Sequence, residues 1–181
     1  SGNPGILDFL PLQESHRRWI IDSVCSLLQE APGVYREEGD CNTVVVETDN
    51  GYILIDPSST GHDTSWLTLK FKQRALQAVL FTHAHQDHTN GFSLWPSAVG
   101  TPVIIQREWE KTYNYPLRFE SFYTRRNRKF TGGGWMPRKA ETPLLPTITF
   151  IDEWKGVIDG VEVVLIHAPA ETEDASLIWF P

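Results

Sequence analysis

The most constraining feature of this chain is an apolar strand that leads directly into a cluster of histidines. Residues Ala78–Thr82 form a short apolar run, typical of a strand that is buried on both faces of a sheet. The next six residues, His83–His88, read His-Ala-His-Gln-Asp-His and hold three of the six histidines in the chain. Because α/β proteins commonly place their sites at the carboxyl ends of strands, we expect the chemistry of the chain to be concentrated here.

The flanking sequence alternates between strand and helix patterns. β-Branched runs at Thr43–Thr48 and Tyr52–Asp56 flank an Asp-Asn-Gly turn, which predicts a β-hairpin. Apolar positions at helical spacing predict a helix over about Glu14–Glu30. The other expected elements are helices near Asp63–Arg74 and from Arg107–Tyr113, strands at Val103–Gln106, Thr147–Ile151, Val161–His167 and Ser176–Phe180, and a turn at Trp154–Gly156. This order predicts an α/β layered domain.

Composition narrows the class of protein. With 181 residues, 40% of them hydrophobic, the chain suits one globular domain, which we place at residues 1–181. No apolar run approaches the roughly 18 residues of a membrane helix, so no membrane span is expected. The formal net charge of −7 disfavours nucleic acid as a partner.

The cysteines and the amino terminus bear on the compartment. Cys25 and Cys41 fit neither a metal-binding spacing nor a dense disulfide framework, so we interpret both as reduced core thiols, with a single disulfide as the alternative. Together with the absence of a signal-peptide pattern, this favours the cytoplasm. Because the chain begins at Ser1 without a methionine, the compartment stays open.

A basic, aromatic segment at residues 111–139 contrasts with the acidic average. It holds half of the 16 lysines and arginines, interleaved with seven aromatic residues. We interpret it as a loop or insertion beside the site. Three alternatives stay open for it: a solvated loop, an anion-binding lid in which Arg125, Arg126 and Arg128 contact the substrate, or a nucleic-acid groove.

The spacing within His83–His88 predicts metal binding rather than a solvated polar loop. In an extended backbone His83 and His85 point to the same side and can share one metal ion. Asp87 and His88 follow directly and offer an oxygen and a nitrogen to a second ion. Neutral imidazole and carboxylate are ligands that zinc accepts, and two zinc ions about 3.5–4 Å apart would clamp a hydroxide and a substrate oxygen.

In this cluster the chain resembles the metallo-β-lactamase superfamily, whose signature is His-x-His-x-Asp-His. Asn42–Val46 and Ile53–Asp56 resemble the early Asn-bearing strand of the family and its apolar strand that ends in Asp. The resemblance implies an αββα sandwich and a hydrolase that uses a zinc-activated water, with two Zn²⁺ ions in the complete site. It also implies that Asp56 supports the site without binding metal.

One departure from the family pattern indicates a branch. Many members read His-x-Pro-Gly-His-Thr, whereas residues 167–172 here read His-Ala-Pro-Ala-Glu-Thr, so Glu171 stands in place of a ligand histidine. This substitution resembles the alkyl sulfatase branch, as do Gly33–Tyr35 and the continuation to Pro181. The branch implies a small-molecule ester substrate that carries negative charge. It places a first zinc on His83, His85 and Glu171 and a second on His88 and Asp87, and we assign Asp87 to catalysis as well.

Several neighbouring features leave alternatives open. We interpret His167 as a packing residue rather than a ligand. Glu173 and Asp174 are alternatives to Glu171, or they orient the ligands through hydrogen bonds. The alternative functions are a lactone, thioester, β-lactam or phosphodiester hydrolase, and a non-catalytic remnant of the fold that binds a partner.

The number of ligands predicts that only part of the full fold is present. A complete two-metal site of this superfamily also needs a bridging acid and a final histidine, and no histidine follows His167. We therefore expect an excised portion truncated at its carboxyl end, a complementing segment or homo-oligomer that completes the site, or an incomplete metal site.

Overall fold

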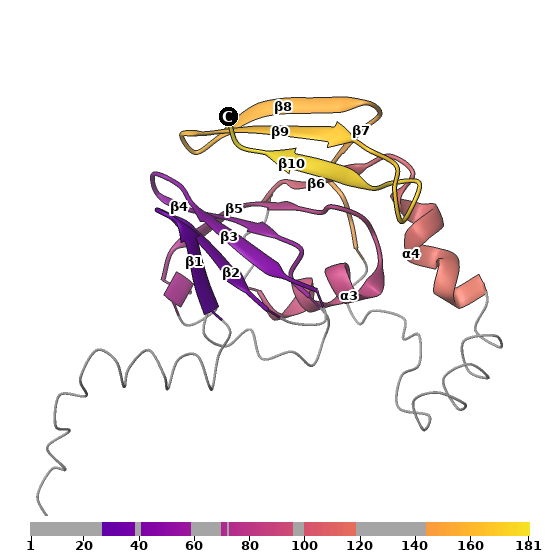
Figure 1. The fold of residues 1–181 in the computed structure, drawn as a ribbon, viewed down its shortest axis with the longest axis horizontal. Coiled ribbons are helices and arrows are strands. Elements are labelled where there is room, and N and C mark those ends of the chain that lie inside the picture. Colours follow the sequence, from indigo (N-terminus) through magenta and orange to yellow (C-terminus); the bar gives the residue numbers. More distant parts are fainter. Residues whose placement is uncertain (1–26, 39–40, 59–69, 72, 96–99, 119–143) are drawn as a thin grey trace, which may run out of the picture.

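Two β-sheets lie face to face in the computed structural model (Figure 1). The structure describes residues 27–38, 41–58, 70–71, 73–95, 100–118 and 144–181. The larger sheet contains, in this spatial order, β1 (Leu27–Ala31), β2 (Val34–Glu37), β3 (Thr43–Glu47), β4 (Gly51–Ile55), β5 (Ala75–Leu80), β6 (Val103–Gln106) and β7 (Ile148–Phe150). The smaller sheet contains β10 (Ser176–Trp179), β9 (Val161–His167) and β8 (Glu153–Ile158).

The amino-terminal part of the larger sheet is antiparallel. The predicted hairpin is confirmed: β3 pairs with β4, with Glu47 opposite Tyr52 across the turn. The predicted helix over Glu14–Glu30 is wrong at its carboxyl end, because residues 27–30 belong to β1, which pairs with β2. Pairing to a neighbouring strand overrides the helical spacing of the apolar residues there. Residues 14–26 lie outside the described part.

From β4 onward the larger sheet is parallel, and this arrangement sets the position of the site. β4, β5, β6 and β7 pair in parallel, so their carboxyl ends meet at one edge of the sheet. All five residues of β4 are buried, as expected for a strand with both faces covered. The strand predicted at Ala78–Thr82 is confirmed, although β5 begins and ends earlier.

The smaller sheet corrects one prediction. The expected turn at Trp154–Gly156 lies instead within β8, which pairs antiparallel with β9. The prediction of a turn was based on Gly156. In the structure a Cβ at residue 156 would lie 2.6 Å from the indole of Trp154, so the strand requires a residue without a side chain there. The two residues are two positions apart and share a face of the strand, so the glycine leaves space for the aromatic ring.

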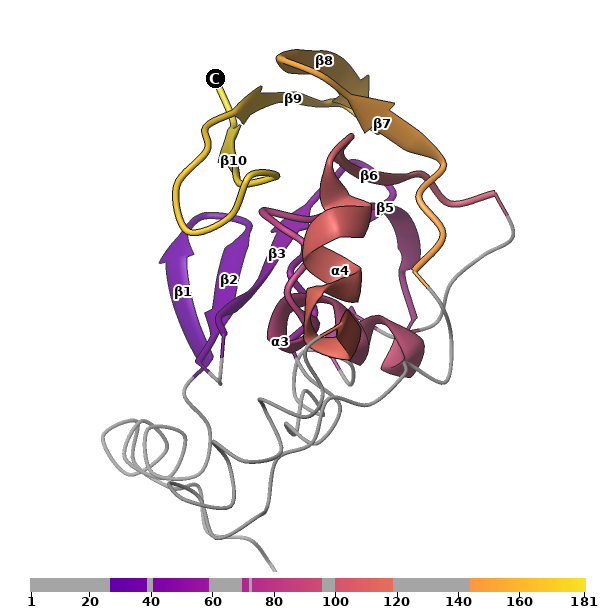
Figure 2. The ribbon, with the colours of Figure 1, turned by 90° about the vertical axis from the view of Figure 1, so that its right-hand side faces the viewer.

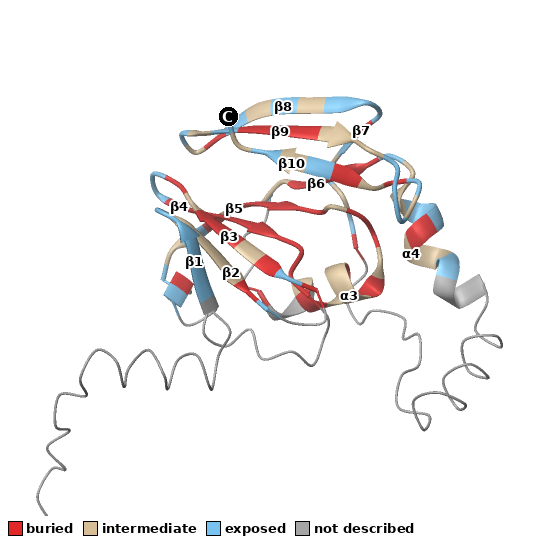
Figure 3. Cartoon of the chain, in the orientation of Figure 1, coloured by how far each residue is buried: buried red, intermediate tan, exposed pale blue. Residues whose placement is uncertain are grey.

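The central strands of the larger sheet are largely buried (Figure 3), and apolar side chains pack on both of its faces. Between the two sheets, Ile53, Leu80 and Ile104 pack with Val163 and Leu165 of β9. On the opposite face, the core includes Phe71, Phe81 and Trp95, covered in part by the short 3₁₀ helix η1 (Asn90–Leu94) and by α4 (Trp109–Arg118). The layers are thus a helical layer, the larger sheet and the smaller sheet.

The remaining predictions fall partly outside the described residues. The helical start at Arg107–Tyr113 is confirmed in α4, and this helix includes the first residues of the basic segment, which are therefore not loop. Residues 119–139 of that segment, with Arg125, Arg126 and Arg128, lie outside the described part, as does most of Asp63–Arg74. Within the described ranges, no helix has the length and apolar character needed to cross a bilayer.

Candidate metal centre

Polar residues at the carboxyl ends of two adjacent strands lie close together at one edge of the larger sheet. Asp56 directly follows β4, and His83 lies just beyond β5, so both stand at the carboxyl ends of adjacent parallel strands. From His85 the chain enters the short helix α3 (Gln86–Thr89). Glu171 comes from the loop between β9 and β10, which descends from the smaller sheet toward α4 (Figures 1 and 2). The candidate site is therefore built by both sheets.

His83, His85 and Glu171 form a group with the spacing of a metal site. Their candidate ligand atoms all lie within 4.8 Å of one another. His83 Nε2 is 3.1 Å from His85 Nδ1, and His85 Nδ1 is 3.6 Å from Glu171 Oε1. Ligand atoms about 2.0–2.2 Å from a tetrahedral zinc ion are about 3.3–3.6 Å apart, so the two distances from His85 Nδ1 are close to those expected around one such ion.

A hydrogen-bond chain through Thr82 determines which nitrogen of His83 is free. Thr82 Oγ1 is 2.5 Å from Asp56 Oδ2 and 3.1 Å from His83 Nδ1. The hydroxyl has one proton, which it donates to the Asp56 carboxylate, so it accepts the proton on His83 Nδ1. His83 Nε2 then carries a bare lone pair that faces His85. This is the arrangement in which a second residue orients a metal-binding histidine.

Asp56 orients His88 in the same way. His88 Nδ1 lies 2.9 Å from Asp56 Oδ2, and Nε2, on the other side of the ring, is 3.8 Å from Oδ2 of Asp87. The two residues expected to hold a second metal therefore lie side by side. Asp56 is 4% exposed, and its carboxylate contacts both Thr82 and His88.

The histidines differ in their affinity for protons. Burial lowers the pKa of His83, and the nearby His88 and His85 lower it further, so that His83 is neutral and able to bind metal. Burial also lowers the pKa of His88, but hydrogen bonds to Asp56 and Cys41 outweigh burial and raise the pKa to about 10.

The backbone around Asp56 is held in an uncommon conformation. Asp56 and Ser58 have positive φ angles of 45° and 64°, which few residues other than glycine adopt. Gly91 of η1 lies against this segment and donates its N–H to the Ser58 carbonyl over 2.8 Å. A Cβ at residue 91 would collide with the Pro57 carbonyl oxygen, so a glycine is required for this approach.

Cys41 contacts the backbone of Asp87. Its thiol is free and buried, as predicted, and donates to the Asp87 carbonyl at 3.0 Å. It thereby fixes the backbone of a predicted metal ligand. Cys25 lies outside the described residues.

The loop between β9 and β10 places the three alternatives for the third ligand in different roles. The side chain of Glu171 is 72% exposed and faces His85. His167 Nε2 donates to the Glu173 carbonyl at 2.7 Å, while the Glu173 carboxylate is 3.3 Å from Lys111 Nζ. Asp174 is fully buried and bonded within the protein. The geometry therefore favours Glu171 as the third metal-binding group.

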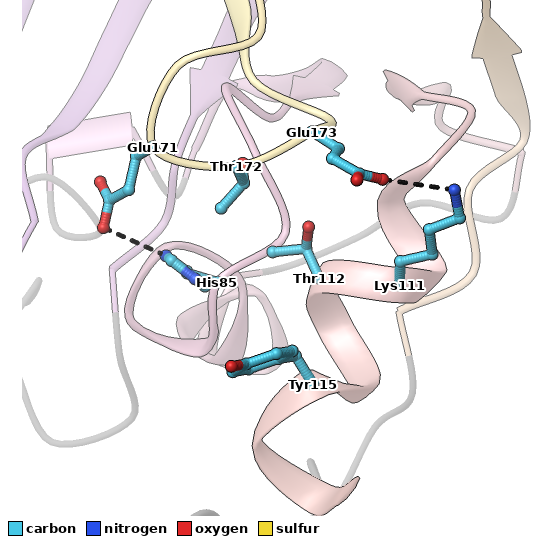
Figure 4. A pocket seen from close by; sticks show the side chains of 7 residues that line it. All are labelled: His85, Lys111, Thr112, Tyr115, Glu171, Thr172 and Glu173. Carbon is cyan, nitrogen blue, oxygen red and sulfur yellow. Dashed lines mark hydrogen bonds and ion pairs between the residues drawn. The ribbon is translucent and has the colours of Figure 1, made fainter. Parts of the chain in front are cut away.

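A cavity of about 450 Å³ opens beside this group (Figure 4). Figure 4 shows the loop that carries Glu171 on one side and α4 on the other. Lys111 is at the rim, where it pairs with Glu108 at 2.5 Å as well as with Glu173. The lining residues are His85, Lys111, Thr112, Tyr115, Glu171, Thr172 and Glu173.

Several of the residues that support the site were not singled out from the sequence. Thr82 carried no signal beyond its position directly before the histidines. Thr112 and Tyr115 were part of a segment read as a loop, and only the helical start at residue 107 indicated that one face of a helix could reach the site. The contact of Cys41 with Asp87 joins residues far apart in sequence, which no local pattern reveals.

The chain is similar in sequence to a curated alkylsulfatase. The curated linear primary-alkylsulfatase of Pseudomonas sp. (strain ATCC 19151) is 21% identical over 165 residues, which are 76% of this chain and 30% of that protein. The chain thus spans about a third of the length of the curated relative that it matches.

Solved structures share the fold. The stereoselective inverting sec-alkylsulfatase Pisa1 from Pseudomonas sp. matches with a TM-score of 0.72 and 20% identity, over 89% of this chain and 30% of that one. A beta-lactamase from Chitinophaga pinensis matches with a TM-score of 0.59 and 21% identity, over 85% of this chain and 56% of that one. The predicted fold class is confirmed, and the alkylsulfatase matches support the predicted branch.

The family assignment rests on a match over most of the chain. The family model described as "Metallo-beta-lactamase superfamily" matches residues 36–181, which include the histidine cluster, Asp56 and Glu171. The chain belongs to the metallo-beta-lactamase superfamily.

Proposed function

We propose that the chain is a zinc-dependent hydrolase that acts on a small sulfate ester. The observation that carries the proposal is the group of His83, His85 and Glu171, whose spacing fits one zinc ion and whose third member is a carboxylate. Two alkylsulfatases among the relatives support the choice of ester, and the superfamily supports hydrolysis.

Each residue in the proposal has a defined task. His83, His85 and Glu171 hold the first ion, and Asp87 and His88 hold part of a second site. Asp56 and Thr82 orient the imidazoles. When bound, zinc would supply Lewis acidity that generates hydroxide from water near neutral pH. One water is consumed and one ester bond is broken, which yields an alcohol and sulfate.

The cavity supplies the place where the ester binds. Thr172 lines it, and its buried hydroxyl has no hydrogen-bond partner among the described residues. Lys111 is the lysine of the cavity lining, and its charge is paired with Glu108 and Glu173. Arg125, Arg126 and Arg128 remain proposed substrate contacts that lie outside the described residues.

Zinc content and dodecyl sulfate hydrolysis test the proposal. The chain, purified without chelator and supplied with zinc, should bind the metal and release sulfate from dodecyl sulfate. H83A should abolish the release because it removes a ligand of the first ion, whereas D159N, which changes a side chain of the β8–β9 turn, should retain it. Failure of the wild-type chain to take up zinc would refute the proposal.

A substrate panel distinguishes the ester class. Lactone, thioester, β-lactam and nucleic-acid substrates, tested under the same conditions, should be turned over more slowly than dodecyl sulfate. Faster turnover of any of them would replace the sulfate ester with that substrate. Zinc binding without turnover of any ester would favour a non-catalytic remnant of the fold.

A further inference from the structure

The carboxylate of Asp174 joins three segments of the chain in the interior of the protein. The residue is 0% exposed. Its Oδ2 accepts the N–H of Ala84 at 2.8 Å, and its Oδ1 accepts the hydroxyl of Thr112 at 2.6 Å. These partners belong to the histidine cluster and to α4, while Asp174 itself belongs to the loop between β9 and β10. A buried carboxylate is costly unless it is satisfied in this way.

The contact with Ala84 holds the backbone between two members of the candidate metal-binding group. Ala84 lies between His83 and His85, so fixing its N–H fixes the backbone that carries both imidazoles. Asp174 is also three residues from Glu171 in the same loop. Nearby, Ser176 donates its N–H to the Thr82 carbonyl at 2.8 Å, which holds the start of β10 against the end of β5. One carboxylate thus connects the two parts of the chain that must meet to bind one ion.

The contact with Thr112 extends the connection to the cavity. Thr112 is buried in α4 and lines the cavity beside His85 and Glu171. Because its hydroxyl donates to the same carboxylate, Asp174 holds both the wall of the cavity and the histidine cluster.

We propose that Asp174 is a positioning residue that sets the distance between His83 and His85 on one side and Glu171 on the other, and that Thr112 fixes the cavity wall to the same point. The proposal rests on the proposed function where it states that these three residues bind zinc. Outer partners of metal ligands, when removed, typically lower metal affinity by about 10–100-fold.

Zinc affinity of the full chain tests the proposal. It is measured by competition with a chromophoric chelator, with zinc alone as the ligand. D174A should weaken binding about 10-fold or more, because it removes both hydrogen bonds. D174N should stay within about threefold of the wild type, because its amide oxygen accepts from Ala84 and its NH₂ donates to the Thr112 hydroxyl. D174A with unchanged affinity, or D174N as weak as D174A, would overturn the proposal.

A matched control separates positioning from general stability. Asp159 accepts a backbone N–H, from Asn50 at 2.6 Å, and a threonine hydroxyl, from Thr48 at 2.7 Å, so it makes the same two kinds of contact. It lies in the turn between β8 and β9, at the opposite end of β9 from Asp174. D159A should leave zinc affinity unchanged, and an equal loss in D159A and D174A would overturn the proposal.

A readout in the metal-free chain makes the result independent of zinc binding. The amide proton of Ala84, observed by NMR, should exchange with solvent faster in D174A than in the wild type and remain protected in D174N. If the wild-type chain binds no zinc, the proposed function fails, while this exchange still decides whether Asp174 holds the cluster. If D174A does not fold, T112V, which removes one hydroxyl, should show a smaller loss of zinc affinity, and an unchanged affinity would overturn the role of Thr112.

Discussion

Asp159 and Asp174 make the same kind of contact at the two ends of β9, in very different surroundings. Each carboxylate accepts a backbone N–H and a threonine hydroxyl. Asp159 joins the β8–β9 turn to the β3–β4 turn and also accepts the side-chain amide of Asn50 at 2.7 Å. Asp174 joins the β9–β10 loop to the histidine cluster and α4, and it is fully buried.

The difference shows how similar chemistry serves stability at one end of the fold and the site at the other. Near Asp159, water can reach the turn and replace a lost hydrogen bond. Around Asp174 no water replaces it, so any loss is felt by the residues that its carboxylate holds. One of those residues, Ala84, lies between the candidate metal ligands His83 and His85.

The largest expected effect is on stability when the two carboxylates are removed. D174A should lower the free energy of unfolding by about 2–4 kcal/mol, because it leaves two buried donors unsatisfied. D159A should lower it less, even though alanine must also adopt the positive φ of 45° at that residue. Urea denaturation of the two variants measures both values, and an equal or larger loss in D159A would contradict the comparison.

A smaller effect is expected when the two threonines lose their hydroxyls. T112V and T48V each remove one hydroxyl bonded to a carboxylate, so each should cost about 1 kcal/mol of stability. Only T112V should also raise the KM for dodecyl sulfate, because only Thr112 lines the cavity. Urea denaturation and steady-state kinetics on the two variants check these values. A raised KM in T48V would show that the two ends of β9 are not independent.

The smallest expected effect is on how the free energy of unfolding changes with pH under acidic conditions. Hydrogen bonds from Thr48 and Asn50 hold the pKa of Asp159 below its usual range. A lowered folded pKa stabilises the protein above the unfolded pKa of about 3.9, and that stabilisation is lost as the pH falls through the folded value. The difference in unfolding free energy between the wild type and D159N should therefore shrink below about pH 4. A difference that stays constant from pH 7 to pH 3 would contradict this.

The sequence was most informative where the signal is local. The hairpin around Asp49–Gly51, the strand before the histidines and β6 were all predicted, because hydrophobic period and turn chemistry act over a few residues. The predictions failed where distant contacts decide: residues 27–30 become a strand by pairing with β2, and Gly156 serves Trp154 rather than a turn.

The candidate site follows the same rule. His83, His85, Asp87 and His88 lie within six residues of the sequence, so their spacing alone suggested metal binding. Glu171 was found only through a family pattern, because nothing in its neighbourhood shows that its loop reaches His85. The contacts of Asp174 with Ala84 and Thr112 span 90 and 62 residues, beyond the range of any local pattern.

The spatial order of the larger sheet, identical to its order along the chain, has a consequence for synthesis. As the chain leaves the ribosome at about 5–20 residues per second, each new strand finds its neighbour already made. His83 and His85 emerge early, while Glu171 and Asp174 follow only after several more seconds. The nascent protein therefore passes through a stage in which His83 and His85 are present without Glu171, the third member of the candidate group.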